Sequence, residues 1–207
     1  MGLKRRSGKK AASKLYLRNF RVKTIEMAKT ALQILIAFTL TLLIPAFGWH
    51  FLGPLYAALF LIGYLAGFLL WLTFPSKTNW DRLKVPYWLT LAVFLLLHKT
   101  EENQMKFFET VSQKITGGTV PPLSAGLAIG LLVLPIGAWL IIPLLIRSRN
   151  ELGYYSIWTF FASMGITELA HFFLPLLTKE PYGYFPGMAS AVLLAPLAWW
   201  GISRMIK

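Results

Sequence analysis

The sequence contains no cysteine, which excludes disulfide bonds, thiolate metal sites and cysteine nucleophiles. Any metal would therefore have to be held by nitrogen and oxygen ligands. Charge is also scarce, because Asp, Glu, Lys and Arg make up 14% of the 207 residues. A soluble domain typically has about 25%. With eight acidic residues and three histidines, few positions can support acid–base or metal chemistry.

Hydrophobic residues make up 56% of the chain and fall in blocks of roughly 18 or more residues with almost no charge. These blocks are apolar on every side, whereas helices of a soluble protein alternate apolar and polar faces. The sequence therefore predicts an all-α fold, a polytopic membrane bundle in a single domain of residues 30–207. We expect six spans, at about 30–49, 55–74, 87–113, 124–146, 154–177 and 188–205.

The basic residues predict how this bundle is oriented. Seventeen of the 21 lie in the N-terminal segment, the C-terminus and two of the predicted loops, which a six-span topology places on one side. Because basic residues are enriched on the cytoplasmic side, both termini are predicted to be cytoplasmic. Residues 1–29 form a basic tail, disordered at its start, with an interfacial helix or helix extension at 15–29. We expect this tail to contact anionic lipid or a protein partner, and we expect no specific nucleic acid.

Three of the eight acidic residues and two of the three histidines fall in two short stretches, HKTEEN and ELAH. Residues three or four apart share a helix face, so His98 faces the same way as Glu101 and Glu102. By the same rule, Glu168 shares a face with His171. At about 1.5 Å per residue, both groups lie roughly 16–25 Å into the membrane, in its outer half. Ionisable groups inside a span are costly and usually functional, so we predict that these five residues form one site.

Histidine and glutamate in this pattern are typical of metal ligands. The set resembles a carboxylate-bridged dimetal centre, in which Glu-x-x-His helices and further carboxylates hold two ions. One zinc ion held by two histidines and one glutamate is equally allowed, and iron or manganese also suits these ligands. Glu102 could instead serve as a general base. Metal-free acid–base catalysis, a proton or ion path, and simple interhelical hydrogen bonds remain as alternatives.

The stretch His98-Lys99-Thr100-Glu101-Glu102 matches the pattern that names the HXXEE domain family of integral membrane proteins. The family pattern also has a further histidine, matched by His171, and a Tyr-x-Pro-Gly motif, matched by residues 184–187. The chain resembles this family over about residues 45–205. The resemblance implies a bacterial or archaeal membrane protein whose matched residues form a site. It implies no reaction.

Tyr184 lies in the loop that is expected on the same side as the site. It could act as a lid that donates a hydrogen bond to substrate or to metal-bound water, or it could simply belong to a turn fixed by Pro186 and Gly187. We therefore predict a metal-dependent membrane enzyme for a lipid or apolar small molecule, with Glu102 and Tyr184 as catalytic candidates. An iron site would favour oxidation and a zinc site hydrolysis. The alternatives are an accessory or transport subunit of a membrane complex, or an acid–base isomerase.

Overall fold

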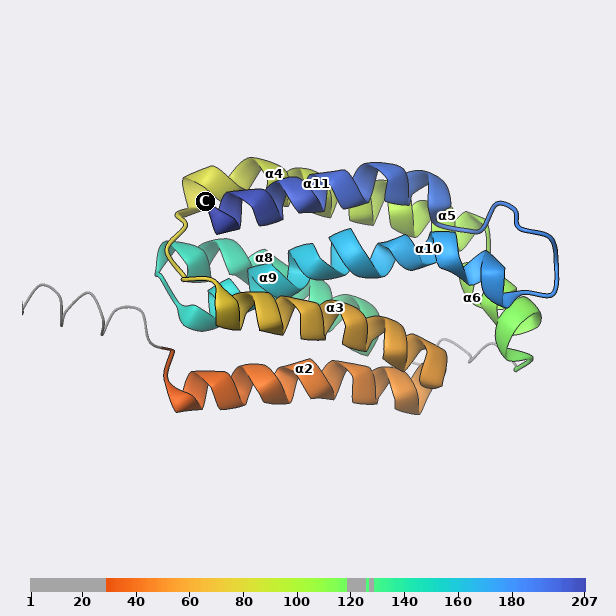
Figure 1. Cartoon of the computed structure of the whole chain (residues 1–207), viewed down its shortest axis with the longest axis horizontal. Coiled ribbons are helices and arrows are strands. Elements are labelled where there is room, and N and C mark those ends of the chain that lie inside the picture. Colours follow the sequence, from red (N-terminus) through yellow and green to blue (C-terminus); the bar gives the residue numbers. More distant parts are fainter. Residues whose placement is uncertain (1–28, 119–125, 127–128) are drawn as a thin grey trace, which may run out of the picture.

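The computed structural model describes residues 29–118, 126 and 129–207. Every element in these ranges is a helix and no strand occurs in them, which confirms the all-helical fold class for this part of the chain (Figure 1). The predicted basic tail lies outside the described residues, apart from Lys29. Part of the predicted loop before the fourth span does so too.

Two antiparallel helices, α2 (Ala31–Leu52) and α3 (Pro54–Thr73), form a hairpin along one side of the bundle (Figure 1). Thr30 caps α2 in a capping box with the residue three positions later. A single residue, Gly53, joins the helices, and its φ of 94° suits glycine because it has no Cβ. Pro54 then occupies the first position of α3, where its missing N–H costs nothing. The break between the first two spans, predicted at about residues 50–54, is therefore a single residue.

The third predicted span begins as one continuous helical path. It runs through α4 (Trp80–Ala92), the π-helix η1 (Val93–His98) and α5 (Lys99–Gln104). Asn79 caps its start by accepting a hydrogen bond from the backbone N–H of Arg82 at 3.2 Å. A π segment widens the helix locally and is frequent at functional sites, and this one ends on a predicted ligand.

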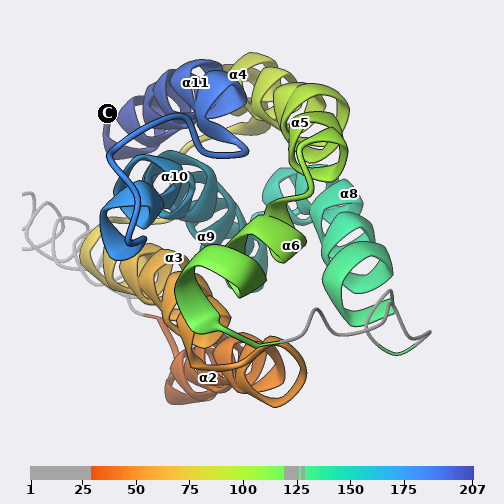
Figure 2. The ribbon, with the colours of Figure 1, turned by 90° about the vertical axis from the view of Figure 1, so that its right-hand side faces the viewer.

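The prediction that this helix continues to about Gln113 is wrong. The chain turns sharply at Lys106, whose φ of 54° is left-handed and uncommon outside glycine. The short helices α6 (Phe107–Val111) and η2 (Ser112–Thr116) then cross the end of the bundle (Figure 2). The turn buries Phe107 in an apolar cluster, whereas a straight helix would have carried this ring away from the bundle.

Helix α9 occupies the centre of the bundle and contacts α3, α8 and α11 (Figure 2). Its packed face is aromatic, and the rings of Trp158 and Phe161 are completely buried. This core holds the helices that carry the site in fixed positions. The remaining elements are η3 (Ile129–Val133), α8 (Leu134–Arg147), α9 (Glu151–Ile166), η4 (Thr167–Leu169), α10 (Ala170–Phe173), η5 (Leu174–Leu177) and α11 (Met188–Ile206).

Large apolar side chains such as Leu32, Leu96 and Leu144 lie exposed on the outside of the bundle. A continuous apolar exterior is stable in lipid and not in water, which is consistent with an integral membrane protein. Helix α8 is apolar but has 14 residues, fewer than the roughly 20 that a span needs. The six-span topology and the cytoplasmic termini therefore stay predictions. Among the described residues, four stretches are long and apolar enough to cross a membrane: Ala31–Leu52, Pro54–Thr73, Glu151–Leu177 and Met188–Ile206.

Candidate metal centre

His98 is the last residue of the π-helix η1, and its imidazole is completely buried. The ring of Phe94 stacks on it with 5.6 Å between ring centroids. Its Nδ1 lies 2.9 Å from Oγ of Ser190 in α11. Glu102, one turn later in α5, lies on the same face, with Oε1 3.5 Å from Nε2 of His98. The outer ring nitrogen, Nδ1, is thus hydrogen-bonded to another helix, and the inner one, Nε2, faces a carboxylate.

A second pair lies where α9 tightens into the 3₁₀ turn η4 and continues as α10. Glu168 and His171 are three residues apart and share a face, with Oε2 and Nε2 3.2 Å from each other. Nδ1 of His171 lies 2.5 Å from the carbonyl oxygen of Pro186, in the loop before α11. The ring of Phe107 covers this imidazole at 5.0 Å between centroids. His171 is therefore buried and held by a hydrogen bond at Nδ1, as His98 is.

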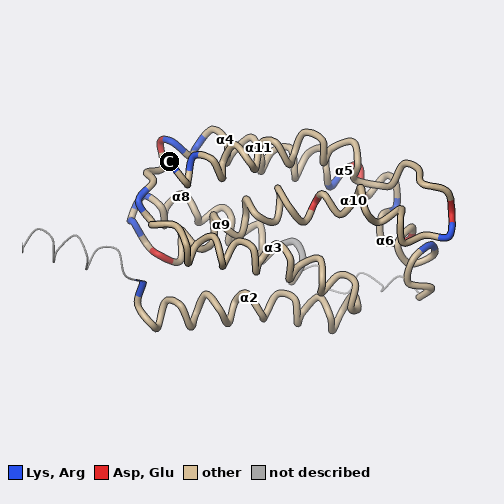
Figure 3. The backbone as a smooth tube through the Cα atoms, in the orientation of Figure 1, with Lys and Arg blue, Asp and Glu red and all other residues tan. Residues whose placement is uncertain are grey.

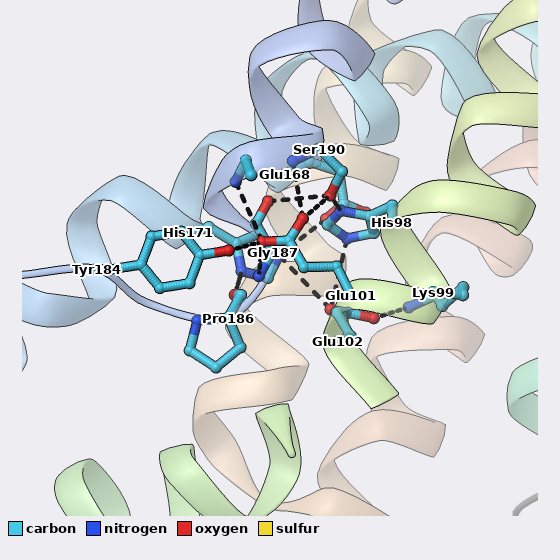
Figure 4. Close-up of polar contacts among 11 residues, drawn as sticks. His98, Lys99, Glu101, Glu102, Glu168, His171, Tyr184, Pro186, Gly187 and Ser190 are labelled. Carbon is cyan, nitrogen blue, oxygen red and sulfur yellow. Dashed lines mark hydrogen bonds and ion pairs between the residues drawn. The ribbon is translucent and has the colours of Figure 1, made fainter. Parts of the chain in front are cut away.

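The structure brings these four side chains together at one point (Figure 4). Nε2 of His98 lies 3.0 Å from Oε2 of Glu168 and 3.5 Å from Oε1 of Glu102. Nε2 of His171 lies 3.2 Å and 3.5 Å from the same two oxygens. Around a tetrahedral ion with bonds of about 2.0–2.1 Å, ligand atoms are about 3.3–3.4 Å apart. The four histidine–carboxylate separations lie near this value, and all four ligand atoms lie within 4.8 Å of one another, so a single ion could contact all of them.

The outer hydrogen bonds fix which ring nitrogen of each histidine carries the proton. A carbonyl oxygen can only accept, so Nδ1 of His171 donates to Pro186. Ser190 has one hydroxyl proton and donates it to Glu101 at 2.5 Å, so its oxygen accepts from Nδ1 of His98. In its neutral form, each imidazole would direct the lone pair of Nε2 toward two carboxylate oxygens. Nε2 of His98 is buried and has no hydrogen-bond partner among the described residues.

Four electron-rich atoms this close together repel one another, and burial makes the repulsion costly. A divalent cation between them removes it, because the ion accepts both lone pairs and neutralises two carboxylates. A second proton on each imidazole is the other remedy. Metal-binding histidines usually donate their outer N–H to an oxygen, as both histidines do here. The donor set, its spacing and its outer partners all fit a divalent metal.

Glu101, the fifth predicted ligand, lies outside this group of four side chains. Its carboxylate accepts the backbone N–H groups of Gly187, Ala189 and Ser190 at 2.9, 3.1 and 2.8 Å. The hydroxyl groups of Ser190 and Tyr184 also donate to it. Five donors fill a carboxylate, which has about four lone-pair positions. Glu101 therefore caps the start of α11 from a neighbouring helix.

Successive residues on a helix point about 100° apart, which explains why Glu101 and Glu102 separate. Only Glu102 can face the group that contains Glu168, so the expected five-ligand set is a set of four. Its other oxygen lies 2.5 Å from Nζ of Lys99, which also lies 4.8 Å above the ring of Phe94. Sequence reasoning missed Lys99, although its spacing of three residues from Glu102 could have indicated the pair.

The family model described as "Protein of unknown function with HXXEE motif" matches residues 88–201, more than half of the chain. The chain belongs to the HXXEE family. Within the motif, His98 and Glu102 are the residues that reach the four-residue group, and Glu101 caps α11. No curated protein and no solved structure matches this chain.

Tyr184, in the loop that precedes α11, is directed toward the HXXEE motif (Figure 4). Its hydroxyl donates to Glu101. A hydrogen bond from Tyr184 to substrate or to metal-bound water, one of its two predicted roles, stays a prediction. Partial burial, together with the hydrogen bond to this carboxylate, raises the pKa of the Tyr184 hydroxyl above its ordinary value. The hydroxyl therefore keeps its proton at neutral pH and stays a donor. In this structure Tyr184 supports the cap.

Gly187 has a role that the turn interpretation missed. Its φ is 94°, a conformation that side chains rarely adopt. A Cβ at this position would also lie 2.3 Å from Cε1 of His171, far inside contact distance. The glycine thus makes room for the imidazole while its N–H binds Glu101.

Gly187→Ala should displace His171 and reduce metal affinity by about 10–100-fold, the range found when the support of a metal ligand is lost. Backbone strain should cost a further 1–3 kcal/mol or so of stability. Metal titration and thermal unfolding of the purified protein measure the two effects. Gly137→Ala is the matched control, since nothing lies within 4 Å of its added methyl group. Equal metal affinity in both variants would contradict this role for Gly187.

Proposed function

We propose that this HXXEE protein is a membrane-embedded enzyme that depends on a divalent metal and acts on a lipid or another apolar small molecule. The observation that carries the proposal is the buried group in which the Nε2 atoms of two histidines face two carboxylate oxygens at 3.0–3.5 Å. We infer a single ion, because Glu101 is engaged elsewhere and four donor atoms suit one metal better than two. The ligands would be His98, Glu102, Glu168 and His171.

When bound, the ion would supply a Lewis acid that polarises a substrate oxygen. A zinc ion held by all four side chains would be coordinatively saturated, as in structural zinc sites. Iron and manganese accept more ligands and would leave room for substrate, which favours an oxidation. Hydrolysis at zinc would require one of the four ligands to leave.

Glu102 is the best candidate for the residue that takes a proton from substrate. Its separations from both histidines are 3.5 Å, longer than the 3.0 and 3.2 Å of Glu168, so it is the looser member of the group. Lys99 holds its second oxygen and would balance its charge when the first oxygen is released. The rings of Phe94 and Phe107 lie against the two imidazoles and exclude water from this side. An apolar substrate suits these surroundings.

Elemental analysis tests the proposal. Wild-type protein, reloaded after chelation, should hold about one divalent ion per chain, and His98→Ala/His171→Ala should hold almost none. His50→Ala is the control, because His50 is exposed, contacts Phe51 and lies outside the group. A folded wild-type protein with no more metal than the double variant would refute metal dependence. That result would leave an acid–base isomerase or an accessory subunit as the better account.

A further inference from the structure

Basic side chains gather at one end of the bundle, where α3 ends, α4 begins and α11 ends (Figure 3). The distribution of basic residues predicts that this end faces the cytoplasm. The opposite end, near the candidate metal centre, mixes both signs of charge. The basic residues described at the first end are Lys29, Lys77, Arg82, Lys84, Arg147, Arg149, Arg204 and Lys207, and the acidic ones are Asp81 and Glu151.

A hollow of about 390 Å³ lies within this basic end. Three of its lining side chains are cations, those of Lys77, Arg82 and Lys207, and the other two, Thr78 and Asn79, are neutral and polar. No acidic side chain lines it. Its volume is large enough for a phosphate group together with part of a lipid head group.

The acidic residues nearby are already engaged with other groups. Asp81 pairs with Lys84 at 3.2 Å. Glu151 accepts hydrogen bonds from the indole of Trp71 at 3.1 Å and from the hydroxyl of Ser76 at 2.6 Å. Within the described ranges, no carboxylate lies within 4.0 Å of the three cations that line the hollow. Three like charges around one space attract an anion.

The position of the hollow indicates where the anion comes from. It lies beside the ends of two helices that are long and apolar enough to cross a membrane, α3 and α11. About two turns before the end of α11, the guanidinium of Arg204 lies 5.8 Å from the ring of Trp200, and tryptophan is enriched at the membrane interface. The hollow is therefore at the depth of the lipid head groups.

We propose that this hollow binds the phosphate of an anionic phospholipid head group through Lys77, Arg82 and Lys207. Charge-assisted hydrogen bonds from Lys and Arg are the usual means by which proteins hold phosphate. All five lining residues fall outside residues 88–201, so the site belongs to the part of this chain that the HXXEE model does not match. It is independent of the candidate metal centre.

Binding can be measured by thermal unfolding and native mass spectrometry of the full chain in neutral detergent. Short-chain phosphatidylglycerol should raise the unfolding midpoint and stay bound, whereas phosphatidylcholine should not. Lys77→Gln/Arg82→Gln should weaken the affinity for phosphatidylglycerol by at least about tenfold. Lys207→Gln, a milder change, should give a smaller loss. Inorganic phosphate forms a separate arm, and a full shift with phosphate alone would identify a soluble phosphate as the ligand of the same site.

Arg147→Gln/Arg204→Gln is the control for diffuse attraction, because it removes two charges at the same end but outside the hollow and leaves the Asp81–Lys84 pair intact. This variant should bind phosphatidylglycerol nearly as well as the wild type. Equal losses in both double variants would mean that the lipid responds only to net charge, and the proposal would fail. It would also fail if the folded Lys207→Gln and Lys77→Gln/Arg82→Gln variants kept wild-type affinity.

Discussion

Glu101→Gln should lower the free energy of unfolding of the metal-free protein by at least about 3 kcal/mol, whereas Glu102→Gln should change it by less than about 1 kcal/mol. The carboxylate of Glu101 accepts five hydrogen bonds at the start of α11. An amide in its place would turn a donor toward donors and leave several of them unpaired. An amide at position 102 can keep its oxygen toward Lys99 and turn its N–H groups toward the two histidines, so it relieves repulsion there.

Unfolding in detergent, with a chelator present, measures this difference between adjacent glutamates. The metal affinity of the two variants should show the reverse order, with Glu102→Gln losing more than Glu101→Gln. If both substitutions lowered stability equally, the separation of the two roles would be wrong. Tyr184→Phe provides a milder comparison, because it removes one of the five donors and leaves the other four.

Saturating metal should stabilise the wild-type protein by about 4 kcal/mol when the free ion is 1,000 times its Kd, and Glu168→Gln should abolish this gain. Glu168 lies closest to both histidines, so it contributes most to the donor set. In the absence of metal the same substitution should be neutral or slightly stabilising. The reason is that an amide N–H can donate to the lone pair of Nε2 on His98, which now has no partner among the described residues.

The effects of Glu168→Gln on stability with and without metal, taken together, distinguish a metal site from an ion-pair cluster. A purely structural ion-pair cluster predicts a loss of stability for Glu168→Gln both with and without metal, because protonated histidines would lose their counter-charge. A metal site predicts a loss only when the ion is present. His50→Ala should keep the full gain, since this residue lies outside the group.

The helices themselves were largely predictable. Apolar blocks, together with Gly53 and Pro54 at helix ends, place most helical boundaries within a few residues. The third helix is an exception, because it begins at Trp80 and not at the predicted residue 87. The sharp turn at Lys106 was not predictable, because the following residues continue a plausible helical pattern. It results from the burial of Phe107 against residues distant in sequence, which no local pattern contains.

The candidate site was also predictable only in part. Spacing of three and four residues predicted that His98 pairs with Glu102, and Glu168 with His171, and the structure brings both pairs to one point. Spacing could not tell which of the two adjacent glutamates faces the group, since the choice depends on the position of α11. The need for Gly187 was also hidden, because the ring that occupies the space beside it belongs to another segment.

The four-residue group joins chain segments that are far apart in sequence. Glu102 and Glu168 are separated by α6, α8 and α9, and Glu101 ties α5 to the beginning of α11. An ion held between these segments would therefore act as a reversible cross-link that closes a long loop, and the entropy of that closure would be removed from the unfolded chain. Binding and release of the ion would then decide whether α5, α10 and the start of α11 separate independently or only as one cooperative unit.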